Sequence, residues 1–396
     1  GTEAQINTAL ASIEYSPDSN FNGSDTLTVL STDSDGTPLN DSDDIEITVS
    51  SVNDIPVNTV PGTQTTNEEI LLPISGISAT DTDDDLTSTE LNVSNGTLTV
   101  VPSGSAVVTS TGTGNLLITG TETDINATLT SLGYTPSLDF VGQDTLTVLS
   151  TDSNNATDTD IVLINVTNVN DEPVNTVPAT QTTPEETVLN ITGLSATDVD
   201  GNLQSTQVSV TNGIIDVTAN GSAIVSSNGS GNVTITGTET DINATLASLS
   251  YTPNSNYVGQ DTLTVLSTDS DGENDTDTVL INVTNVNDAP VNTVPGLQTI
   301  VEETLTAITG ISATDIDGDL ASTELSVTNG IINVTASGAV VISNNASGTV
   351  KITGSEADIN ATLASLTYTP NLNYVGSDTL TVVSTDSFAT PLSDTD

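Results

Sequence analysis

Acidic side chains are the residues of this chain whose types and spacing could do chemistry. The sequence of 396 residues holds 53 Asp and Glu against one Lys or Arg, and it has no His, Cys, Met or Trp. The usual ligands of zinc, haem and iron–sulfur clusters are therefore missing, as are the Ser-His-Asp and Cys-His catalytic sets. Clustered carboxylates favour a hard divalent cation with oxygen ligands.

The acids that stand out lie in tight clusters at turn positions. The segments 198–202 and 315–319 alternate carboxylate or amide side chains around a glycine. They are not EF-hand loops, because no Glu stands at the twelfth loop position, which is taken by Asn92, Ser209 and Ser326. A single Asp-x-Asp-Gly is often only a turn, but three copies of Asp-x-Asp in register with two other acidic motifs favour cation binding. In the first full repeat the glycine is replaced by Asp84.

The overall charge excludes two classes of partner. The formal net charge is -52, and Lys351 is the one basic residue. One cation cannot neutralise a phosphate backbone, so nucleic acid is excluded, and an anionic membrane surface would repel the chain. No run of about 18 apolar residues exists, so we expect no membrane insertion in this segment. Most of the acids need no role beyond keeping the surface soluble.

A motif period of 117 residues divides the chain into repeats. The nine residues from Asn53 to Pro61 return at Asn170 and Asn287 with one position changed, which is typical of tandem repeat proteins. A part of a sandwich cannot bury its own core, so we expect a window from a longer array. The expected modules are the carboxy-terminal part of a truncated repeat at 1–56, the first full repeat at 57–173, the middle repeat at 174–290, and the last repeat at 291–396, which lacks its final strand.

Each repeat has the sequence pattern of a β-sandwich. Short β-branched runs such as 145–149 and 161–166 are separated by Gly, Asn and Asp at turn positions, and about seven such strands fit one period. The segment 238–249 instead has apolar residues at helical spacing, and Thr238 with Asp241 predicts a capping box. The sequence thus predicts an all-β fold of tandem Ig-like β-sandwich modules in an elongated array, with one short helix per repeat.

One Tyr per repeat stands before a Thr-Pro or Ser-Pro step, at Tyr15, Tyr134, Tyr251 and Tyr368. Aromatic residues are otherwise scarce, so the core must consist mainly of Val, Ile, Leu and Ala. We expect each Tyr to anchor the core, with its hydroxyl bonded to the backbone.

Three motifs carry a resemblance that covers the whole chain. The segment 78–83 is similar to the Ala-x-Asp-x-Asp segment of cadherins, 146–152 to their Leu-x-Val-x-Ala-x-Asp strand end, and 52–56 to the Asn-Asp linker between their modules. The array resembles the cadherin-like (immunoglobulin-like) tandem repeats of large bacterial secreted and surface adhesins. The family's acid before the penultimate strand is kept only as Asp139, which favours one or two calcium ions per joint.

The resemblance implies Ca²⁺ at the joints between modules. The ligands would be the linker Asn-Asp pair, the Asp-x-Asp pair and strand-end Asp of the following repeat, and a Glu of the preceding repeat. For the first joint these are Asn53, Asp54, Asp81, Asp83 and Asp152. For the middle joint they are Glu68 or Glu69 with Asn170, Asp171, Asp198, Asp200 and Asp269. For the next joint they are Glu185 or Glu186 with Asn287, Asp288, Asp315, Asp317 and Asp386.

Two classes of function fit these features. The first is a calcium-rigidified structural extender or stalk of a large extracellular adhesin that mediates cell-surface or matrix attachment, with adjacent repeats as its partners. The alternative is a repeat subunit of an extracellular filament, sheath or surface layer, with lateral or end-to-end homotypic assembly. Sugar or ice recognition by Thr-rich faces is a weaker interpretation. We expect no enzyme, because the acids recur in register and no repeat holds a singular constellation.

Overall fold

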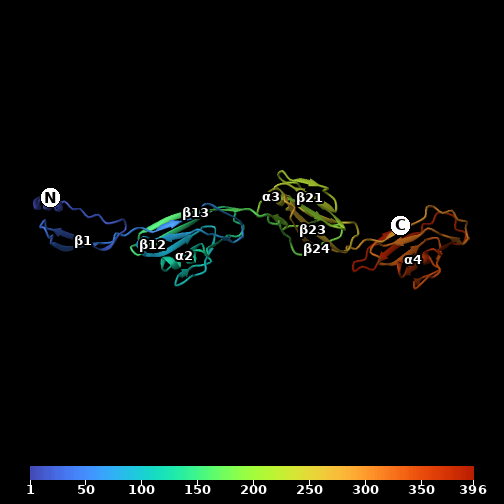
Figure 1. The fold of residues 1–396 in the computed structure, drawn as a ribbon. Helices are drawn as coiled ribbons and strands as arrows, with labels where there is room; N and C mark the ends of the chain where they lie inside the picture. Colours follow the sequence, from blue (N-terminus) through green and yellow to red (C-terminus); the bar gives the residue numbers. More distant parts are fainter. The chain divides into compact units, whose positions relative to one another are not determined.

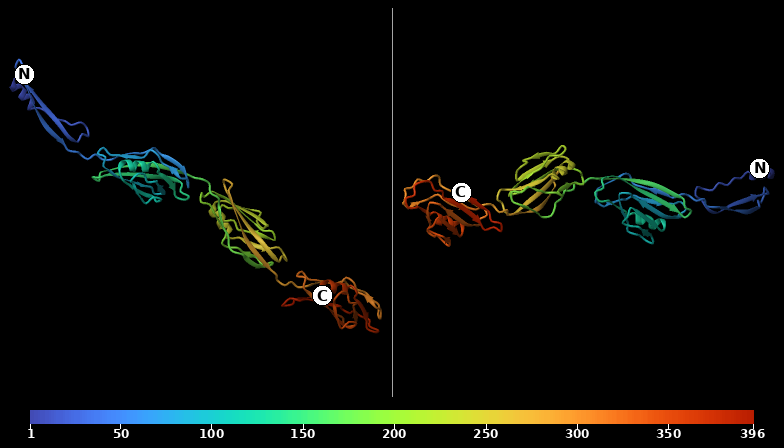
Figure 2. Two further views of the ribbon diagram at one scale, coloured as in Figure 1. Left: turned by 60° about the horizontal axis from the view of Figure 1, so that its bottom comes forward. Right: turned by 180° about the vertical axis from the view of Figure 1, so that it is seen from behind.

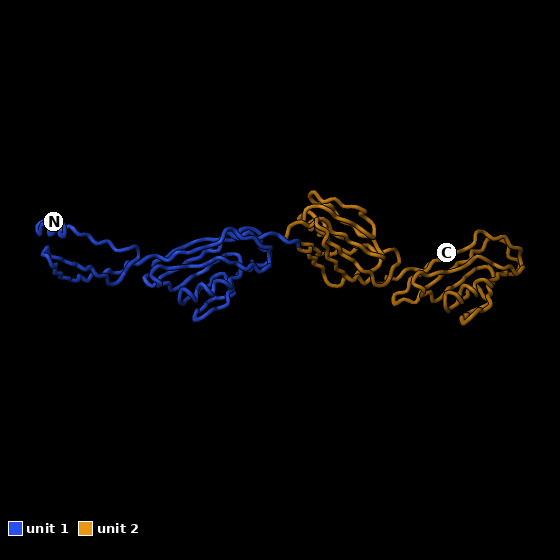
Figure 3. The backbone as a smooth tube through the Cα atoms, in the orientation of Figure 1, with its two compact units in different colours: residues 1–170 blue, residues 171–396 orange.

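A computed structural model describes residues 1–396. The chain divides into two units, 1–170 and 171–396, which are coloured separately in Figure 3. Strands dominate both units, and each copy of the repeat contributes one short helix. The prediction of an all-β chain of tandem sandwiches with one helix per repeat is confirmed. No helix is long and apolar enough to cross a membrane.

The first unit begins with a helix and a hairpin that carry no second layer. These elements are α1 (Glu3–Leu10), β1 (Gly23–Thr32) and β2 (Asn40–Val49). The two strands pair antiparallel over their whole length, from Gly23 opposite Val49 to Thr32 opposite Asn40. Figure 1 shows the helix and the hairpin at the blue, N-terminal end of the chain. No side chain of this segment is buried. The apolar residues of the hairpin therefore have no core to enter.

The same unit continues into a complete two-layered sandwich. One layer is a six-stranded sheet in the order β4-β13-β12-β7-β10-β9, and the other is a three-stranded sheet in the order β5-β11-β8, beside the short pair β3-β6. Its elements are β3 (Val57–Thr59), β4 (Gln64–Asn67), β5 (Leu72–Pro73), β6 (Ser78–Thr80), β7 (Leu86–Asn92), β8 (Gly96–Thr99), β9 (Val107–Thr109), β10 (Asn115–Thr119), α2 (Glu122–Leu129), β11 (Gly133–Pro136), β12 (Gly142–Asp152) and β13 (Thr157–Thr167).

The second unit repeats this sandwich and then most of it again (Figure 2). The middle repeat holds β14 (Val174–Thr176), β15 (Gln181–Pro184), β16 (Leu189–Asn190), β17 (Ser195–Thr197), β18 (Leu203–Ser209), β19 (Gly213–Asp216), β20 (Ile224–Ser226), β21 (Asn232–Thr236), α3 (Glu239–Leu246), β22 (Ser250–Pro253), β23 (Gly259–Asp269) and β24 (Asn274–Thr284). The last repeat holds β25 (Val291–Thr293), β26 (Thr306–Ala307), β27 (Ser312–Thr314), β28 (Leu320–Ser326), β29 (Gly330–Asn333), β30 (Val341–Ser343), β31 (Thr349–Thr353), α4 (Glu356–Leu363), β32 (Thr367–Pro370), β33 (Thr381–Asp386) and β34 (Ser393–Thr395).

Alternation along the central strand of each large sheet decides which side chains enter the core. In β23 the buried positions are every second residue, and they include Leu263, Val265 and the strand-end Asp269. Residues of equal parity in a strand face one side of a sheet, so the acid at the end of the strand points to the same side as the apolar core. Three separate apolar clusters result, within 74–166, 191–283 and 308–382.

The Tyr before the Pro step anchors the core in three repeats, with a carboxylate as its main partner. The prediction is wrong for Tyr15, which is 41% exposed because its segment has no core, and its hydroxyl donates to Asp25 Oδ2 at 3.0 Å. The Tyr251 hydroxyl lies 2.9 Å from Asp261 Oδ2 and 3.2 Å from the Asn212 carbonyl oxygen. Burial, with the carboxylate beside it, raises the pKa of Tyr251 above its ordinary value of 10.0, and in the last repeat it raises that of Tyr368 to about 12. The predicted backbone bond is present, but the bond to Asp261 was not predicted.

The capping box predicted for the helix of each repeat is closed only in α1, where the Gln5 side chain accepts from the Thr2 amide at 3.0 Å. In α2, α3 and α4 only the N-cap side chain makes its bond. Thr238 accepts from the Asp241 amide at 3.2 Å, as predicted. The reciprocal bond of the predicted capping box is not made in α3, because the Asp241 carboxylate instead accepts from the hydroxyl and amide of Ser222. The acid thus ties the helix to the loop after β19. Farther along α3, the Asn243 side chain bonds both backbone groups of Ala196, at 2.8 Å each, and holds the helix against β17.

The last repeat contains an open apolar groove lined by Ile308, Ile311, Tyr368 and Val382, among others. In the middle repeat the counterpart core also contains Val279, Ile281 and Val283 of β24, whereas the core of the last repeat has no such group. The groove is thus an uncovered part of the sandwich core.

Candidate metal centres

The loop between β6 and β7 is shaped by its own acids and by the helix. Asp81 Oδ1 accepts from the Asp83 amide at 2.8 Å, which is an Asx-type turn. The Asp81 amide in turn donates to Glu122 Oε2, in the first turn of α2, at 2.9 Å. These bonds leave the second Asp81 oxygen, Oδ2, for the interior. The loop is therefore fixed by bonds that use only one oxygen of its first acid.

Three carboxylates of the first full repeat converge behind this loop, and we call them the first pocket: Asp81, Asp85 and Asp152. One oxygen from each lies within 4.8 Å of the others. Asp81 is 6% exposed and Asp152 2%. Asp81 Oδ2 and Asp85 Oδ1 are buried and have no hydrogen-bond partner. Burial raises the pKa of the Asp81 carboxyl, although the bond from the Asp83 amide lowers it.

The last repeat builds the same arrangement, the last pocket, from Asp315, Asp319 and Asp386. Asp315 Oδ2 and Asp319 Oδ1 are again buried without a partner. Burial raises the pKa of both carboxyls, and the charge on Asp386 adds to the effect at Asp319. An unpaired buried carboxylate oxygen costs on the order of 1–3 kcal/mol, so two facing oxygens of this kind in each pocket call for a cation.

The middle repeat keeps two of these acids, and an amide replaces the third. Its pocket, the middle pocket, is formed by Asp198, Asn202 and Asp269, which occupy the positions equivalent to those of the other two pockets. Asp198 is 8% exposed and its Oδ2 has no partner. Asn202 donates its side-chain amide to Asp271 Oδ2 at 3.1 Å. Three carbonyl or carboxylate groups remain, but only two of them are charged.

A second acidic group forms at the linker, and it uses the other acid of each Asp-x-Asp pair. In the second unit it comprises Glu185, Asp288 and Asp317. The Asp288 amide donates to Asp317 Oδ2 at 2.8 Å, and the Val286 amide donates to Glu185 Oε1 at 2.8 Å. Burial raises the pKa of Asp288, as do the charges of Asp317 and Glu186. The predicted set of joint ligands thus divides into a linker group and a pocket.

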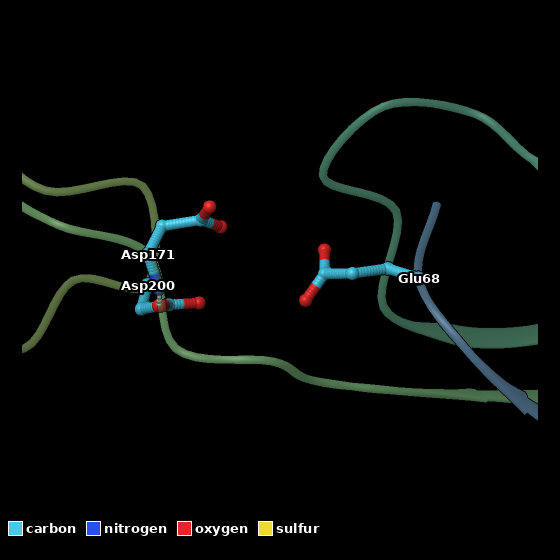
Figure 4. A group of neighbouring side chains, drawn as sticks. All are labelled: Glu68, Asp171 and Asp200. Carbon is cyan, nitrogen blue, oxygen red and sulfur yellow. Dashed lines mark hydrogen bonds between the residues drawn. The ribbon is translucent and has the colours of Figure 1, made fainter. Parts of the chain in front are cut away.

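The two earlier linkers make the same kinds of bond between a linker amide and a carboxylate as the linker at 286–288 does. Figure 4 shows the carboxylates of Asp171 and Asp200 side by side at the start of the second unit, where the Asp171 amide donates to Asp200 Oδ2 at 2.8 Å. Glu68, which is also drawn, belongs to the first unit and accepts from the Val169 amide at 2.6 Å. In the linker between the hairpin and the first full repeat, the Asp54 amide likewise donates to Asp83 Oδ2 at 2.8 Å.

The structure also resolves the choice within each Glu pair. Glu68 and Glu185 are buried, whereas Glu69 and Glu186 are exposed turn residues with positive φ. Glu186 accepts from the Ser255 hydroxyl at 2.8 Å. The linker Asn residues orient the strand-end acids: Asn53 donates to Asp152 Oδ2 and Asn287 to Asp386 Oδ2, both at 2.8 Å. Of the predicted candidates, Glu69 and Glu186 therefore do not join a cluster.

Asp85 and Asp319 are the pocket residues that sequence reasoning missed as ligands. They stand four residues after the first acid of each Asp-x-Asp pair, and the middle repeat has Asn202 there. The recurrence of an acid or amide at this spacing was the available signal. It was hidden because the middle acid of the pair, Asp317 for example, looked like the natural partner but turns to the linker.

Part of the chain is similar in sequence to a known domain family. The sequence model of the bacterial Ig domain matches residues 170–284. No curated protein sequence matches the chain. Among solved structures, the protocadherin gamma B2 cadherin domains 1–5 show 15% identity and a TM-score of 0.37, over 94% of this chain and 65% of that one. The protocadherin GammaB4 extracellular domain shows 16% identity and a TM-score of 0.37, over 94% of this chain and 53% of that one. Mouse cadherin-23 EC22–24 shows 17% identity and a TM-score of 0.32, over 87% of this chain and 97% of that one. The chain thus spans 65% and 53% of the two protocadherin structures.

Proposed function

We propose that this chain, an array of cadherin-like, immunoglobulin-like tandem repeats, is a calcium-stiffened extender of a large extracellular adhesin. Bacterial Ig domains and cadherin-like domains are usually extracellular structural modules. A spacer needs length and stiffness, and near-identical repeats supply both without any unique site. We place the modules at 57–173, 174–290 and 291–396, after a partial repeat at 1–56, and propose the cell surface or a matrix as the setting.

One observation carries the calcium proposal. Asp81 and Asp315 each have a buried carboxylate oxygen with no partner, and so do Asp85 and Asp319 of the same pockets. Folded proteins normally satisfy their buried polar groups, so these oxygens fit a cation that bonds them. Hard oxygen donors suit Ca²⁺, which takes six to eight of them, and backbone carbonyls and water would supply the remainder.

The residues that would hold calcium fall into two sets per joint. The pocket of a repeat would bind one ion through its three side chains. The linker group would bind another, and in the second unit its members are Glu185, Asp288 and Asp317. The linker Asn residues Asn53 and Asn287 orient the strand-end acids of the pockets. The bound ion would neutralise acids that otherwise repel one another by roughly 1 kcal/mol per close pair even in water.

Calcium would stiffen the chain because the linker acids and the pocket acids sit on adjacent stretches of backbone. Asp288 lies in the linker and Asp317 in the loop of the repeat that follows, whereas Glu185 belongs to the repeat before. An ion bound by all three removes the freedom of the linker. Extracellular modules typically bind calcium at about 0.1–1 mM, so the joint would be rigid outside a cell and mobile in calcium-poor surroundings.

Small-angle scattering on the full chain tests the proposal. With millimolar calcium we expect a narrow distribution of maximum dimensions, and with EGTA a broad one. Asp317→Asn should broaden the distribution in calcium, because it removes one charged ligand from the linker group. Glu46→Gln, which removes an exposed charge of the hairpin, serves as the matched control. Equal distributions with calcium and with EGTA would contradict the proposal.

The alternative, a repeat subunit of an extracellular filament, sheath or surface layer, predicts an ordered assembly of copies of this chain. Electron microscopy of the purified chain separates the two functions. Single beaded particles support the extender, and a lateral lattice supports the assembly. We propose no enzymatic role, because the acids recur in register in every repeat and none of them forms a singular constellation.

A further inference from the structure

The three pockets share two positions and differ at the third. The first and last pockets have Asp85 and Asp319 where the middle pocket has Asn202. We infer that Asn202 makes the middle pocket a weaker calcium site than the other two, so that the chain carries cation sites of graded strength. This inference rests on the proposed function and deepens it, because it states which repeat releases its ion first.

The backbone around the pocket is the same in the middle and last repeats. The Asp200 amide bonds Asp198 Oδ1 at 2.9 Å, and the equivalent bond to Asp315 is 3.0 Å. The helix Glu accepts from the first acid's amide at 3.1 Å in the middle repeat and 3.0 Å in the last. A serine amide bonds the carbonyl of Asn202 at 3.1 Å and that of Asp319 at 3.0 Å. The two pockets therefore differ in side-chain charge and not in framework.

Each pocket also contains a feature that points to a ligand independently of its acidity. Asp81, Asp198 and Asp315 are more than nine-tenths buried, and Oδ2 of each has no partner. In the first and last pockets one oxygen of this acid lies within 4.8 Å of an oxygen from each of two other carboxylates. In the middle pocket Asn202 has turned its amide nitrogen to Asp271. The binding position is thus kept in the middle repeat, but with one carboxylate fewer.

The loss of one carboxylate lowers affinity for a divalent ion. Calcium sites are tuned by the number of charged ligands at a given geometry. A neutral amide oxygen coordinates calcium but contributes no net charge. The pocket therefore loses the Coulomb attraction between the ion and one negative charge at contact distance. We expect the middle pocket to need about tenfold more free calcium for half-saturation than the first and last pockets.

Hydrogen exchange with mass spectrometry on the full chain can measure all three pockets in one sample. The amides that bond the strand-end acids are the reporters: those of Asn154 and Ala156 on Asp152, of Asp271 to Glu273 on Asp269, and of Phe388 and Leu392 on Asp386. Calcium should slow exchange in each of these peptides. The calcium midpoint of the middle peptide should lie about tenfold above the other two.

Two reciprocal substitutions locate the cause. Asn202→Asp should bring the middle midpoint down to that of the other peptides, and Asp319→Asn should raise the last midpoint to that of the middle peptide. Asn190→Asp adds the same charge to an exposed position on β16, in the other sheet of the middle repeat, and should leave all three midpoints in place.

The outcomes separate this inference from the proposed function. If no peptide responds to calcium, the proposed function itself fails. If all three respond with one midpoint, calcium binding stands but the grading by Asn202 is wrong. If Asn202→Asp unfolds the middle repeat, Asp319→Asn still decides, and an unchanged last midpoint in that variant would overturn the inference.

Discussion

Two buried acids of the middle repeat have the same side chain and opposite surroundings. Asp261 is 3% exposed and Asp198 8%. Asp261 accepts from the Tyr251 hydroxyl and from the amides of Thr211, Asn212 and Thr262, at 2.9 to 3.2 Å. Asp198 accepts from one amide through Oδ1, and its Oδ2 has no partner. The first acid is complete within the folded chain, whereas the second needs something from outside it.

This contrast separates the body of a repeat from its end. The body contains an apolar core, the Tyr–Asp pair and a helix held by Asn243, none of which requires an ion. The end contains carboxylates that the chain alone does not satisfy. Each repeat should therefore fold without calcium, and calcium should act on the ends.

The largest expected effect is the loss of the satisfied acid. Asp261→Ala should destabilise the middle repeat by about 3 kcal/mol or more, because it leaves the Tyr251 hydroxyl and three backbone amides without their acceptor. The destabilisation should be the same in calcium and in EGTA, as followed by calorimetric unfolding of the full chain. A destabilisation that calcium reverses would break the distinction between body and end.

The next effect concerns the Tyr side of the same pair. Tyr251→Phe should cost about 1.5 kcal/mol, since a bond to a charged acceptor is lost. The folded repeat raises the pKa of Tyr251 above 10.0, so the folded state holds the phenol proton more tightly than the unfolded state does. The stabilisation is complete below pH 10 and disappears as the pH rises through the raised pKa. Above pH 10, wild type should therefore lose a larger part of its stability at pH 8 than Tyr251→Phe does. Unfolding at increasing pH measures this, and an equal or smaller loss in wild type would show that the account is wrong.

The unsatisfied acid should respond in the opposite direction. In EGTA, Asp315→Asn should stabilise the last repeat by about 1 kcal/mol, because the substitution removes a buried charge that has an unpartnered oxygen. In millimolar calcium the same variant should gain less from the ion than wild type does. Calorimetric unfolding of wild type and Asp315→Asn in EGTA and in calcium measures both differences. Destabilisation of the variant in EGTA would show that the chain itself satisfies the Asp315 carboxylate.

The smallest effect is at the helix. Thr238→Ala should cost about 0.5–1 kcal/mol, the usual value of an N-cap side chain. The calcium midpoint of the middle pocket should not change. Glu239 of the same helix turn does accept from the Asp198 amide, but that bond uses the Glu239 side chain and does not depend on the cap. A shift of the middle calcium midpoint in Thr238→Ala would mean that the cap and the pocket are coupled.

The sequence predicted the body of the repeat well because its signals are local. The period of 117 residues, the helix at 239–246 and the Tyr anchor could all be read from neighbouring residues. The family match at 170–284 confirms the recognition of immunoglobulin-like repeats. Asp261 was missed, although it stands at the inward parity of β23 with Leu263 and Val265 and could have been found from that alternation.

The division of the acids at the ends could not be predicted, because it depends on how a loop turns. In the sequence Asp315 and Asp317 form one motif, but Asp315 turns inward to Asp319 while Asp317 accepts from the linker amide of Asp288. Sequence distance gives no direction for a side chain in a turn. The choice of Glu185 over Glu186 has the same cause, since it depends on which residue adopts the positive φ.

The central claim is that the acids at the ends of the repeats bind calcium specifically, and equilibrium dialysis of the full chain with radioactive calcium tests it most directly. At about 0.15 M monovalent salt, which screens diffuse attraction, we expect saturable binding at about 0.1–1 mM free calcium. The triple variant Asp81→Asn, Asp198→Asn and Asp315→Asn should bind the ions of the three pockets about tenfold more weakly, because each pocket loses one charged ligand. The matched triple variant of exposed acids, Asp44→Asn, Glu46→Gln and Asp216→Asn, should bind them as wild type does. Binding that does not saturate, or that falls equally in both variants, would contradict the account and leave the acids as a surface coat.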